Sequence, residues 1–185
     1  MNITKSAVTR SLAVALVAGT LPVAVATTSA QAAPYCGITW GSLAKSRPAL
    51  VPGPVSNVRS GRHTCFDRLV IDLKGKAPGY TVKYVNTFTA QASGATIPLR
   101  GGAKLAITVN APAYTSSGTA SFVPRNRAEV VDVTGYQTFR QVRWDSSFEG
   151  YTSMGVGVRA RLPFRAFTIQ DATSSRLVID VAHHW

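Results

Sequence analysis

Arginine and aromatic side chains are the residues whose spacing in this sequence most favours ligand binding. Between residues 151 and 161, apolar residues alternate with glycine and arginine, and a strand would place the second set on one outward face. That set is Gly155, Gly157, Arg159 and Arg161. Guanidinium groups clasp carboxylates or phosphates and rings stack on sugars, which together suit an anionic sugar polymer. The predicted ligand-binding residues are Arg140, Arg143, Trp144, Tyr151, Arg159, Arg161 and Arg165. The alternative interpretation is a solvated strand face without a ligand.

Catalytic residues are harder to identify. The sequence has no Gly-x-Ser-x-Gly or His-Glu-x-x-His motif and no phosphate-binding glycine loop. His183 and His184 are adjacent, so on a strand they point to opposite faces and cannot share one metal ion. The eight acids are scattered, and the two in one loop, Asp145 and Glu149, are typical of a solvated turn. We therefore expect no enzymatic activity, no metal and no cofactor.

The two cysteines that follow the N-terminal region are Cys36 and Cys65. In an exported protein an even pair predicts a disulfide, here one that closes a loop of about 30 residues. Lipid attachment at Cys36 is a second interpretation, but Ala33-Pro34-Tyr35 does not have the small or aliphatic residues that such a site needs. A free catalytic thiol is a third, and no partner motif supports it.

Residues 1–32 have the pattern of a secretory signal peptide. Lys5 and Arg10 precede an apolar run over Ser11–Ala26, and Ala30-Gln31-Ala32 matches a cleavage site. Cleavage would leave 153 residues and lower the formal charge from +12 to +10. The sequence therefore predicts a secreted protein, extracellular or associated with the cell wall, without a membrane span. A Pro- and Gly-rich leader over residues 33–54 precedes one domain over residues 55–185.

Short β-rich runs separated by turn residues fill this domain, and no window has helical periodicity. The pattern predicts an all-β, antiparallel β-sandwich of about ten strands, or a barrel. The expected strands are 55–59, 68–73, 80–85, 95–99, 105–109, 129–134, 137–144, 151–162, 164–170 and 176–182. Gly101-Gly102 predicts a hairpin between 95–99 and 105–109.

One six-residue pattern occurs twice, as Arg68–Leu73 (RLVIDL) and Arg176–Val181 (RLVIDV). Two buried strands can converge on the same residues, or the copies can hold equivalent places in a pseudo-symmetric pair of sheets. If the copies pair antiparallel, Arg68 is expected near Asp180 and Asp72 near Arg176. We expect a structural role for both aspartates.

Several segments together resemble one known family. They are Val55–Gly61, Cys65–Leu73, Pro78-Gly79-Tyr80, Tyr84-Val85, Pro98–Gly101, Phe148–Tyr151, Gly155–Val158, Pro163-Phe164-Arg165 and Arg176–His183. The chain is similar over residues 55–185 to the AMIN-like domain proteins exported by actinobacteria. Ser174-Ser175 stand where that family commonly has a proline, and a lipid-attachment cysteine is missing.

This resemblance implies a β-sandwich like that of the AMIN domain, which targets amidases to cell-wall material. It transfers no catalytic or ligand residues. The predicted function is a non-catalytic secreted envelope protein that associates with peptidoglycan or anionic wall polymers, and no nucleic acid is expected as a partner. The alternative is a protein-binding module, such as a protease or hydrolase inhibitor, with residues 111–127 as its reactive loop.

Overall fold

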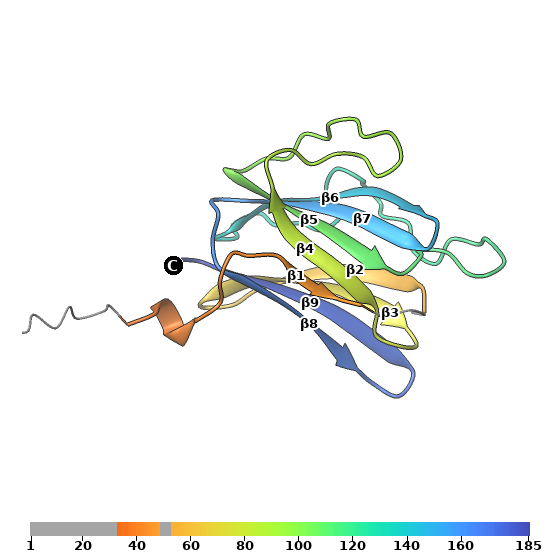
Figure 1. The fold of residues 1–185 in the computed structure, drawn as a ribbon, viewed down its shortest axis with the longest axis horizontal. Coiled ribbons are helices and arrows are strands. Elements are labelled where there is room, and N and C mark those ends of the chain that lie inside the picture. The colour runs from red at the N-terminus through yellow and green to blue at the C-terminus, as the bar shows by residue number, and fades with distance from the viewer. Residues whose placement is uncertain (1–32, 49–52) are drawn as a thin grey trace, which may run out of the picture. The chain divides into compact units, whose positions relative to one another are not determined.

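The computed structural model describes residues 33–48 and 53–185, which fold as two antiparallel sheets with nine strands (Figure 1). The all-β antiparallel sandwich that the sequence predicts is confirmed. The predicted signal peptide lies outside the described residues. Within the described part of the chain, no helix is long and apolar enough to cross a membrane.

The two sheets contain strands from all parts of the domain. The five-stranded sheet has the order β1 (Lys45–Arg47), β4 (Gly79–Val85), β5 (Ala103–Asn110), β7 (Tyr151–Val158) and β6 (Phe139–Phe148). The four-stranded sheet has the order β2 (Val55–Arg62), β3 (Phe66–Lys74), β9 (Ser174–Ala182) and β8 (Phe164–Gln170). A short 3-10 turn, η1 (Tyr35–Gly37), precedes β1.

The hydrophobic core lies between the sheets. Alternate residues of each strand point inward, as the period of two requires. On β3 these are Leu69, Ile71 and Leu73, and they belong to the same buried cluster as Leu105 and Ile107 of β5. The intervening residues of β3 therefore point away from the core. The same alternation applies to β9 and β8, which follow β3 in the sheet.

Two predicted strands are wrong. Residues 95–99 and 129–134 belong to long connections, and β5 pairs with β4 and β7 instead of forming a hairpin across Gly101-Gly102. The two glycines are needed because the main chain after β7 passes close to them. A Cβ at Gly101 would lie 2.4 Å from Val158 O, and a Cβ at Gly102 would lie 2.4 Å from Arg159 O. Both runs have strand-like composition but lack a continuous pairing partner.

Strand β7 also differs from its prediction. It ends at Val158, where the sequence predicts a strand to Leu162, because its pairing with Ala103 of β5 and with Phe139 of β6 stops there. The glycine face of β7 is not bare. Gly155 and Gly157 are buried beneath the 86–102 connection, which Figure 1 shows above the five-stranded sheet.

The repeated pattern forms the centre of one sheet. The two copies lie in β3 and β9, which pair antiparallel with Arg68 opposite Asp180 and Asp72 opposite Arg176. The copies are thus neighbours, and they do not hold equivalent places in two sheets. The predicted pairing of Arg68 with Asp180 is confirmed, with 2.6 Å between Nε and Oδ1. The Asp72 carboxylate instead binds Arg59, and the Arg176 guanidinium binds Asp171.

The N-terminal segment is tied to the sandwich at three places. Strand β1 pairs with β4, and Gly41 O accepts a hydrogen bond from Phe164 N at 3.1 Å. The predicted disulfide between Cys36 and Cys65 is confirmed, and it joins η1 to the turn between β2 and β3. This segment therefore lies along the β4 and β8 side of the sandwich.

Candidate functional site

The seven predicted ligand-binding residues do not form one continuous patch. Three of them, Arg159, Arg161 and Arg165, lie close together in the chain on the β7–β8 connection and the start of β8. The N-terminal segment joins two of these, since Arg161 donates to Ser42 Oγ at 3.2 Å while the Arg165 guanidinium lies over the Trp40 ring. Arg159 donates to the carbonyl oxygen of His183.

The other four predicted residues are spread along β6 and the start of β7. The Arg140 guanidinium donates to backbone carbonyls of Tyr136 and Phe139, and Arg143 lies half-buried opposite Gly155. Trp144 is only 7% exposed and packs on Phe122, so its ring is not part of the surface.

Tyr151 is exposed, but it lies at the opposite end of β7 from Arg159, which comes directly after the strand. At about 3.3 Å per residue, these two residues are roughly 25 Å apart.

A different arrangement of arginines and rings lies on the outer face of the four-stranded sheet. Arg165 of β8, Asp180 of β9 and Arg68 of β3 are register partners in one row across three strands. Asp180 is fully buried, and its two oxygens accept from both arginines, at 2.6 and 2.9 Å from Arg68 and at 2.8 Å from Arg165. One carboxylate therefore holds two guanidinium groups side by side.

Aromatic rings surround these two guanidinium groups. Arg165 lies 4.4 Å from the ring centroid of Trp40 and 4.9 Å from that of Phe167, and Arg68 lies 5.2 Å from that of Phe66. Such cation–π contacts hold a guanidinium in place while its edge stays available to a ligand. The side chain of Arg165 is still 40% exposed.

Two more ion pairs extend the same outer face. Arg59 of β2 binds Asp72 at 2.8 Å, and Arg176 of β9 binds Asp171 in the turn before it. We call the outward residues Arg59, Phe66, Arg68, Arg165, Phe167 and Arg176, together with Trp40, the arginine–aromatic face.

Hydrogen bonds to carboxylates fix the charge state of this face. The bond to Asp180 raises the pKa of Arg68 above its ordinary value, and the bond to Asp72 does the same for Arg59. Burial of each guanidinium opposes this rise in pKa but is the smaller effect. Both arginines are therefore charged at neutral pH and well above it.

Of this face, only Arg165 is among the predicted ligand-binding residues. Arg68 was expected to pair with Asp180, and no role was predicted for the ring of Phe66 next to it. The alternation of Phe66, Arg68 and Val70 against the buried Asp67 and Leu69 is the signal that could have found the face. The missing information was that β3 lies beside β9 and β9 beside β8.

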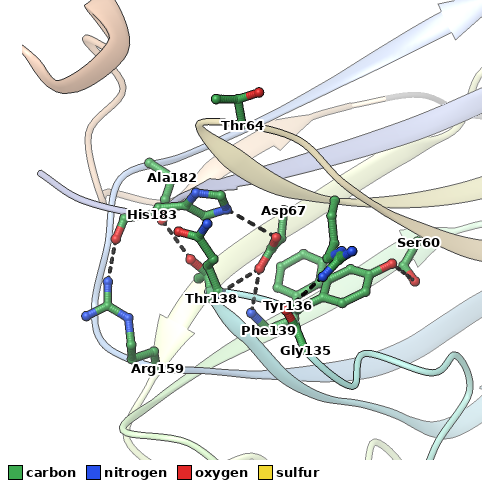
Figure 2. A network of polar contacts seen from close by, with 12 residues as sticks. Ser60, Thr64, Asp67, Gly135, Tyr136, Thr138, Phe139, Arg159, Ala182 and His183 are labelled. Atoms are coloured by element: carbon green, nitrogen blue, oxygen red, sulfur yellow. Dashed lines mark hydrogen bonds and ion pairs between the residues drawn. The ribbon is translucent and has the colours of Figure 1, made fainter.

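A second group of polar residues lies between the sheets, at the end where β3 begins and β9 ends (Figure 2). The Asp67 carboxylate is fully buried, and its Oδ2 accepts from the backbone N–H groups of Thr138 and Phe139 at 2.6 and 3.0 Å. Its Oδ1 lies 3.1 Å from Nε2 of His183, which is 1% exposed. Asp67 therefore connects the four-stranded sheet to the start of β6 in the other sheet.

His183 is fixed by its backbone as well as by its ring. Its N–H donates to Cys65 O at 3.0 Å, next to the disulfide, and its carbonyl accepts from Arg159. Nδ1 of its ring is buried and has no hydrogen-bond partner among the described residues. Across the described ranges, no group of three or more His, Cys, Asp or Glu is arranged to hold a metal ion.

The residues proposed as a reactive loop form a connection with its own hydrogen bonds. Tyr114 and Ala120 make an isolated bridge, and Ser121 Oγ donates to Val55 O at 2.6 Å. The tip of this loop, residues 116–120, is exposed.

Comparison with known proteins bears on most of this chain. The model of one family, described as the AMIN-like domain, matches residues 53–183. No curated protein and no solved structure matches the chain. The family match covers all strands of the sandwich except β1, together with the arginine–aromatic face apart from Trp40 and the buried Asp67–His183 pair. The chain therefore belongs to the AMIN-like domain family.

Proposed function

We propose that this protein is a non-catalytic, exported envelope protein that binds anionic cell-wall polymers or peptidoglycan through its arginine–aromatic face. An AMIN-like domain suggests a peptidoglycan-associated module in general, and together with the Cys36–Cys65 disulfide it suggests an extracytoplasmic protein. The observation that carries the choice of surface is the buried Asp180, which holds Arg68 and Arg165 against three aromatic rings.

Preorganisation is the physical reason to choose this surface over the other arginines. A free arginine loses rotamer freedom when it binds an anion, which costs about 0.5–1.5 kcal/mol for each long side chain. Arg68 and Arg165 are already held by the Asp180 carboxylate and by ring stacking, so most of that cost is met in folding. The adjacent Trp40 and Phe167 rings offer flat apolar surface on which a sugar ring can stack.

Net charge supports the same class of partner. The chain from residue 33 onward has a formal charge of +10, so it is attracted to a polyanionic wall over the distance that salt screening allows. This attraction alone is not specific. Binding at a specific site differs from this attraction because it persists at high salt and depends on particular arginines.

The test is retention of the purified protein on isolated cell walls, with and without their anionic polymers, at low and high salt. We compare Arg68→Gln/Arg165→Gln with Lys76→Gln/Arg125→Gln, which removes the same charge from exposed positions outside the face. The proposal expects loss of retention in the first variant and near-normal retention in the second. Equal loss of retention in both variants would show that net charge alone accounts for binding. Unchanged retention in both variants would overturn the proposed face.

A third variant tests two of the other predicted arginines, Arg159 and Arg161. Arg159→Gln/Arg161→Gln changes the β7–β8 connection, where Arg161 binds Ser42 of the N-terminal segment, and leaves both arginine partners of Asp180 intact. A partial loss of retention would extend the binding surface to this connection. Retention that depends only on residues 116–120 would favour a protein partner instead.

A further inference from the structure

Arg165 differs from the arginine that shares its carboxylate, because the outer edge of its guanidinium is free. Only Nε of Arg165 donates to Asp180, at 2.8 Å, whereas Arg68 uses both Nε and Nη2, at 2.6 and 2.9 Å. Nη1 and Nη2 of Arg165 have no hydrogen-bond partner among the described residues, and neither atom is buried. These two groups form a fork that matches the two oxygens of one carboxylate.

The row of Arg68, Asp180 and Arg165 also has one uncompensated positive charge. Two guanidinium groups share the single carboxylate of Asp180, which is fully buried. The two other arginines of the face each have a carboxylate of their own. The charge available to a ligand on this row is therefore a single one, and it suits one carboxylate better than a run of closely spaced phosphates.

Aromatic rings lie against the free guanidinium. The ring centroids of Trp40, Phe167 and Phe66 are 4.4, 4.9 and 5.7 Å from the Arg165 guanidinium, and all three side chains are partly exposed. A carboxylate that binds the fork lies in the guanidinium plane, so the carbon skeleton attached to it continues next to these rings. A sugar ring has a flat face of C–H groups that can pack there, and a chain of glycerol and phosphate does not.

Trp40 is held in this place by the N-terminal segment. It lies outside residues 53–183, which match the family model. The Cys36–Cys65 disulfide and the hydrogen bond from Phe164 N to Gly41 O fix the chain on either side of it. Its ring also meets the Phe66 ring edge-on, with 5.6 Å between the centroids. The N-terminal segment therefore adds a preorganised ring next to the free fork.

We propose that the Arg165 fork, with the rings of Trp40 and Phe167, is a subsite for a sugar ring that carries a carboxylate. This inference rests on the proposed wall-binding function and specifies the anionic group that the face selects. The carboxylate binds Nη1 and Nη2 of Arg165, and the C–H face of the sugar packs on the two rings. Trp40 and Phe167 thus determine specificity, since a phosphate polymer gains nothing from them. Uronic acids and N-acetylmuramic acid both have the required chemistry.

The experiment is titration of the purified protein with two sugar acids, each paired with a sugar that lacks the charge. Tetragalacturonic acid is compared with its methyl ester, and N-acetylmuramic acid with N-acetylglucosamine. Tripolyphosphate is the third probe, because it has the charge without the sugar ring. Affinity is measured by calorimetry, and the indole N–H resonance of Trp40 is followed by NMR. The acid that binds distinguishes a uronic acid polymer from peptidoglycan as the source.

We expect at least one sugar acid to bind and to shift the Trp40 resonance. Its uncharged counterpart should bind about tenfold more weakly or worse, because the fork then has no carboxylate to bind. Arg165→Gln should weaken binding of the sugar acid by a similar factor. Tripolyphosphate should be bound by charge alone, so its affinity should fall steeply with salt.

The matched variants are Trp40→Leu and Trp185→Leu. Both remove an indole ring, but Trp185 lies outside the face and is 66% exposed. Trp40→Leu should weaken binding of the sugar acid about threefold to tenfold and leave tripolyphosphate binding unchanged, whereas Trp185→Leu should change neither. Phe167→Leu, compared with Phe148→Leu at an exposed position outside the face, is a second test that leaves the N-terminal segment intact.

Three results would overturn the subsite: no binding of either sugar acid, an uncharged sugar that binds as tightly as its acid, or equal effects of Trp40→Leu on the sugar acid and on tripolyphosphate. Retention on cell walls that depends on Arg68 and Arg165 but not on Trp40 or Phe167 would also overturn it, while the wall-binding face would stand. Retention that depends on none of these residues would overturn the face itself, so the two failures can be told apart.

Discussion

Asp67 and His183 form a buried pair, 3.1 Å apart, between residues that are 116 positions apart in the chain. The same carboxylate accepts two N–H groups from the start of β6. Hydrophobic contacts and the hydrogen bond from the Tyr80 hydroxyl to Ala166 O join the sheets elsewhere. At this end the Asp67 carboxylate connects β3 to the end of β9 and to the start of β6. The pair therefore has a structural role.

Loss of this carboxylate should destabilise the fold strongly. Asp67→Ala leaves two backbone N–H groups and the His183 ring without their acceptor, which costs about 3–5 kcal/mol of unfolding free energy. The control is Asp72→Ala, because the Asp72 carboxylate is paired with Arg59 on the outer face instead of being buried between the sheets, and its loss should cost about 1 kcal/mol or less. Urea unfolding of the three proteins measures both values. Similar losses in the two variants would contradict the structural role of Asp67.

A more conservative change at the same position tests the tautomer of His183. In Asp67→Asn the amide oxygen can still accept from Thr138 and Phe139, and the amide nitrogen then faces Nε2. Nε2 must become an acceptor, so the ring proton should move to Nδ1. Imidazole ¹⁵N spectra report this exchange directly, and an unchanged proton on Nε2 would show that the pair is held in another way.

The disulfide should contribute through the unfolded chain. It closes a loop with a sequence separation of 29, so Cys36→Ala/Cys65→Ala should lower the unfolding free energy by about 3–4 kcal/mol in the chain-entropy model. Because Cys65 O accepts from His183 N, hydrogen exchange at that N–H should also become faster. Reduction of the unmodified protein is the matched comparison and should have the same effect. Equal unfolding free energies before and after reduction would contradict a stabilising role of the disulfide.

Local sequence pattern predicted the fold class because strand alternation is visible in each segment separately. The centres of β3, β5, β7 and β9 follow from it, and the disulfide follows from an even cysteine count. Pairing between distant segments has no local signal. For this reason 95–99 and 129–134 looked like strands, and the row of Arg165, Asp180 and Arg68 was not recognised as a face.

The same limit applies to β7 and to the buried pair. The glycines at 155 and 157 were consistent with a bare surface, but Phe88, Leu99 and Arg100 from a distant connection cover them. His183 was weighed only as a metal ligand beside His184. Its partner Asp67 lies on another strand, and no spacing in the sequence indicates that the two meet.

Close packing on Gly157 gives a sharp prediction. A Cβ at this position would lie 1.8 Å from the carbonyl oxygen of Arg100, so Gly157→Ala must displace the backbone of the 86–102 connection. We expect a cost of about 2–3 kcal/mol or more. Gly41→Ala is the control, because its Cβ would have no neighbour within 4 Å, and its effect should be within about 0.5 kcal/mol. Comparable urea midpoints for the two variants would show that the 86–102 connection is not in close contact with Gly157 of β7.

Tyr84 predicts how stability changes at high pH. Its hydroxyl donates to Leu162 O at 2.9 Å and accepts from Leu162 N at 3.0 Å, and burial raises its pKa above the ordinary value of about 10. The hydrogen bond to Leu162 and the charge of Arg161 oppose this rise in pKa but are smaller effects than burial. Above pH 10 the unfolded chain therefore loses this proton before the folded protein does. Its contribution to stability is complete below about pH 10 and is lost as the pH rises through the higher pKa of the folded state.

Tyr84→Phe separates this effect from the other groups that titrate in alkali. The variant loses two hydrogen bonds and should be less stable by about 1–3 kcal/mol at neutral pH. Its unfolding free energy should then fall less steeply than that of the unmodified protein between pH 9 and pH 11, because one proton-linked contribution is gone. Tyr80→Phe should have the same sign, since burial also raises the pKa of Tyr80, against the smaller opposing charge of Arg47. Urea unfolding across this pH range measures the slopes, and identical slopes for Tyr84→Phe and the unmodified protein would show that the buried hydroxyl does not control alkaline stability.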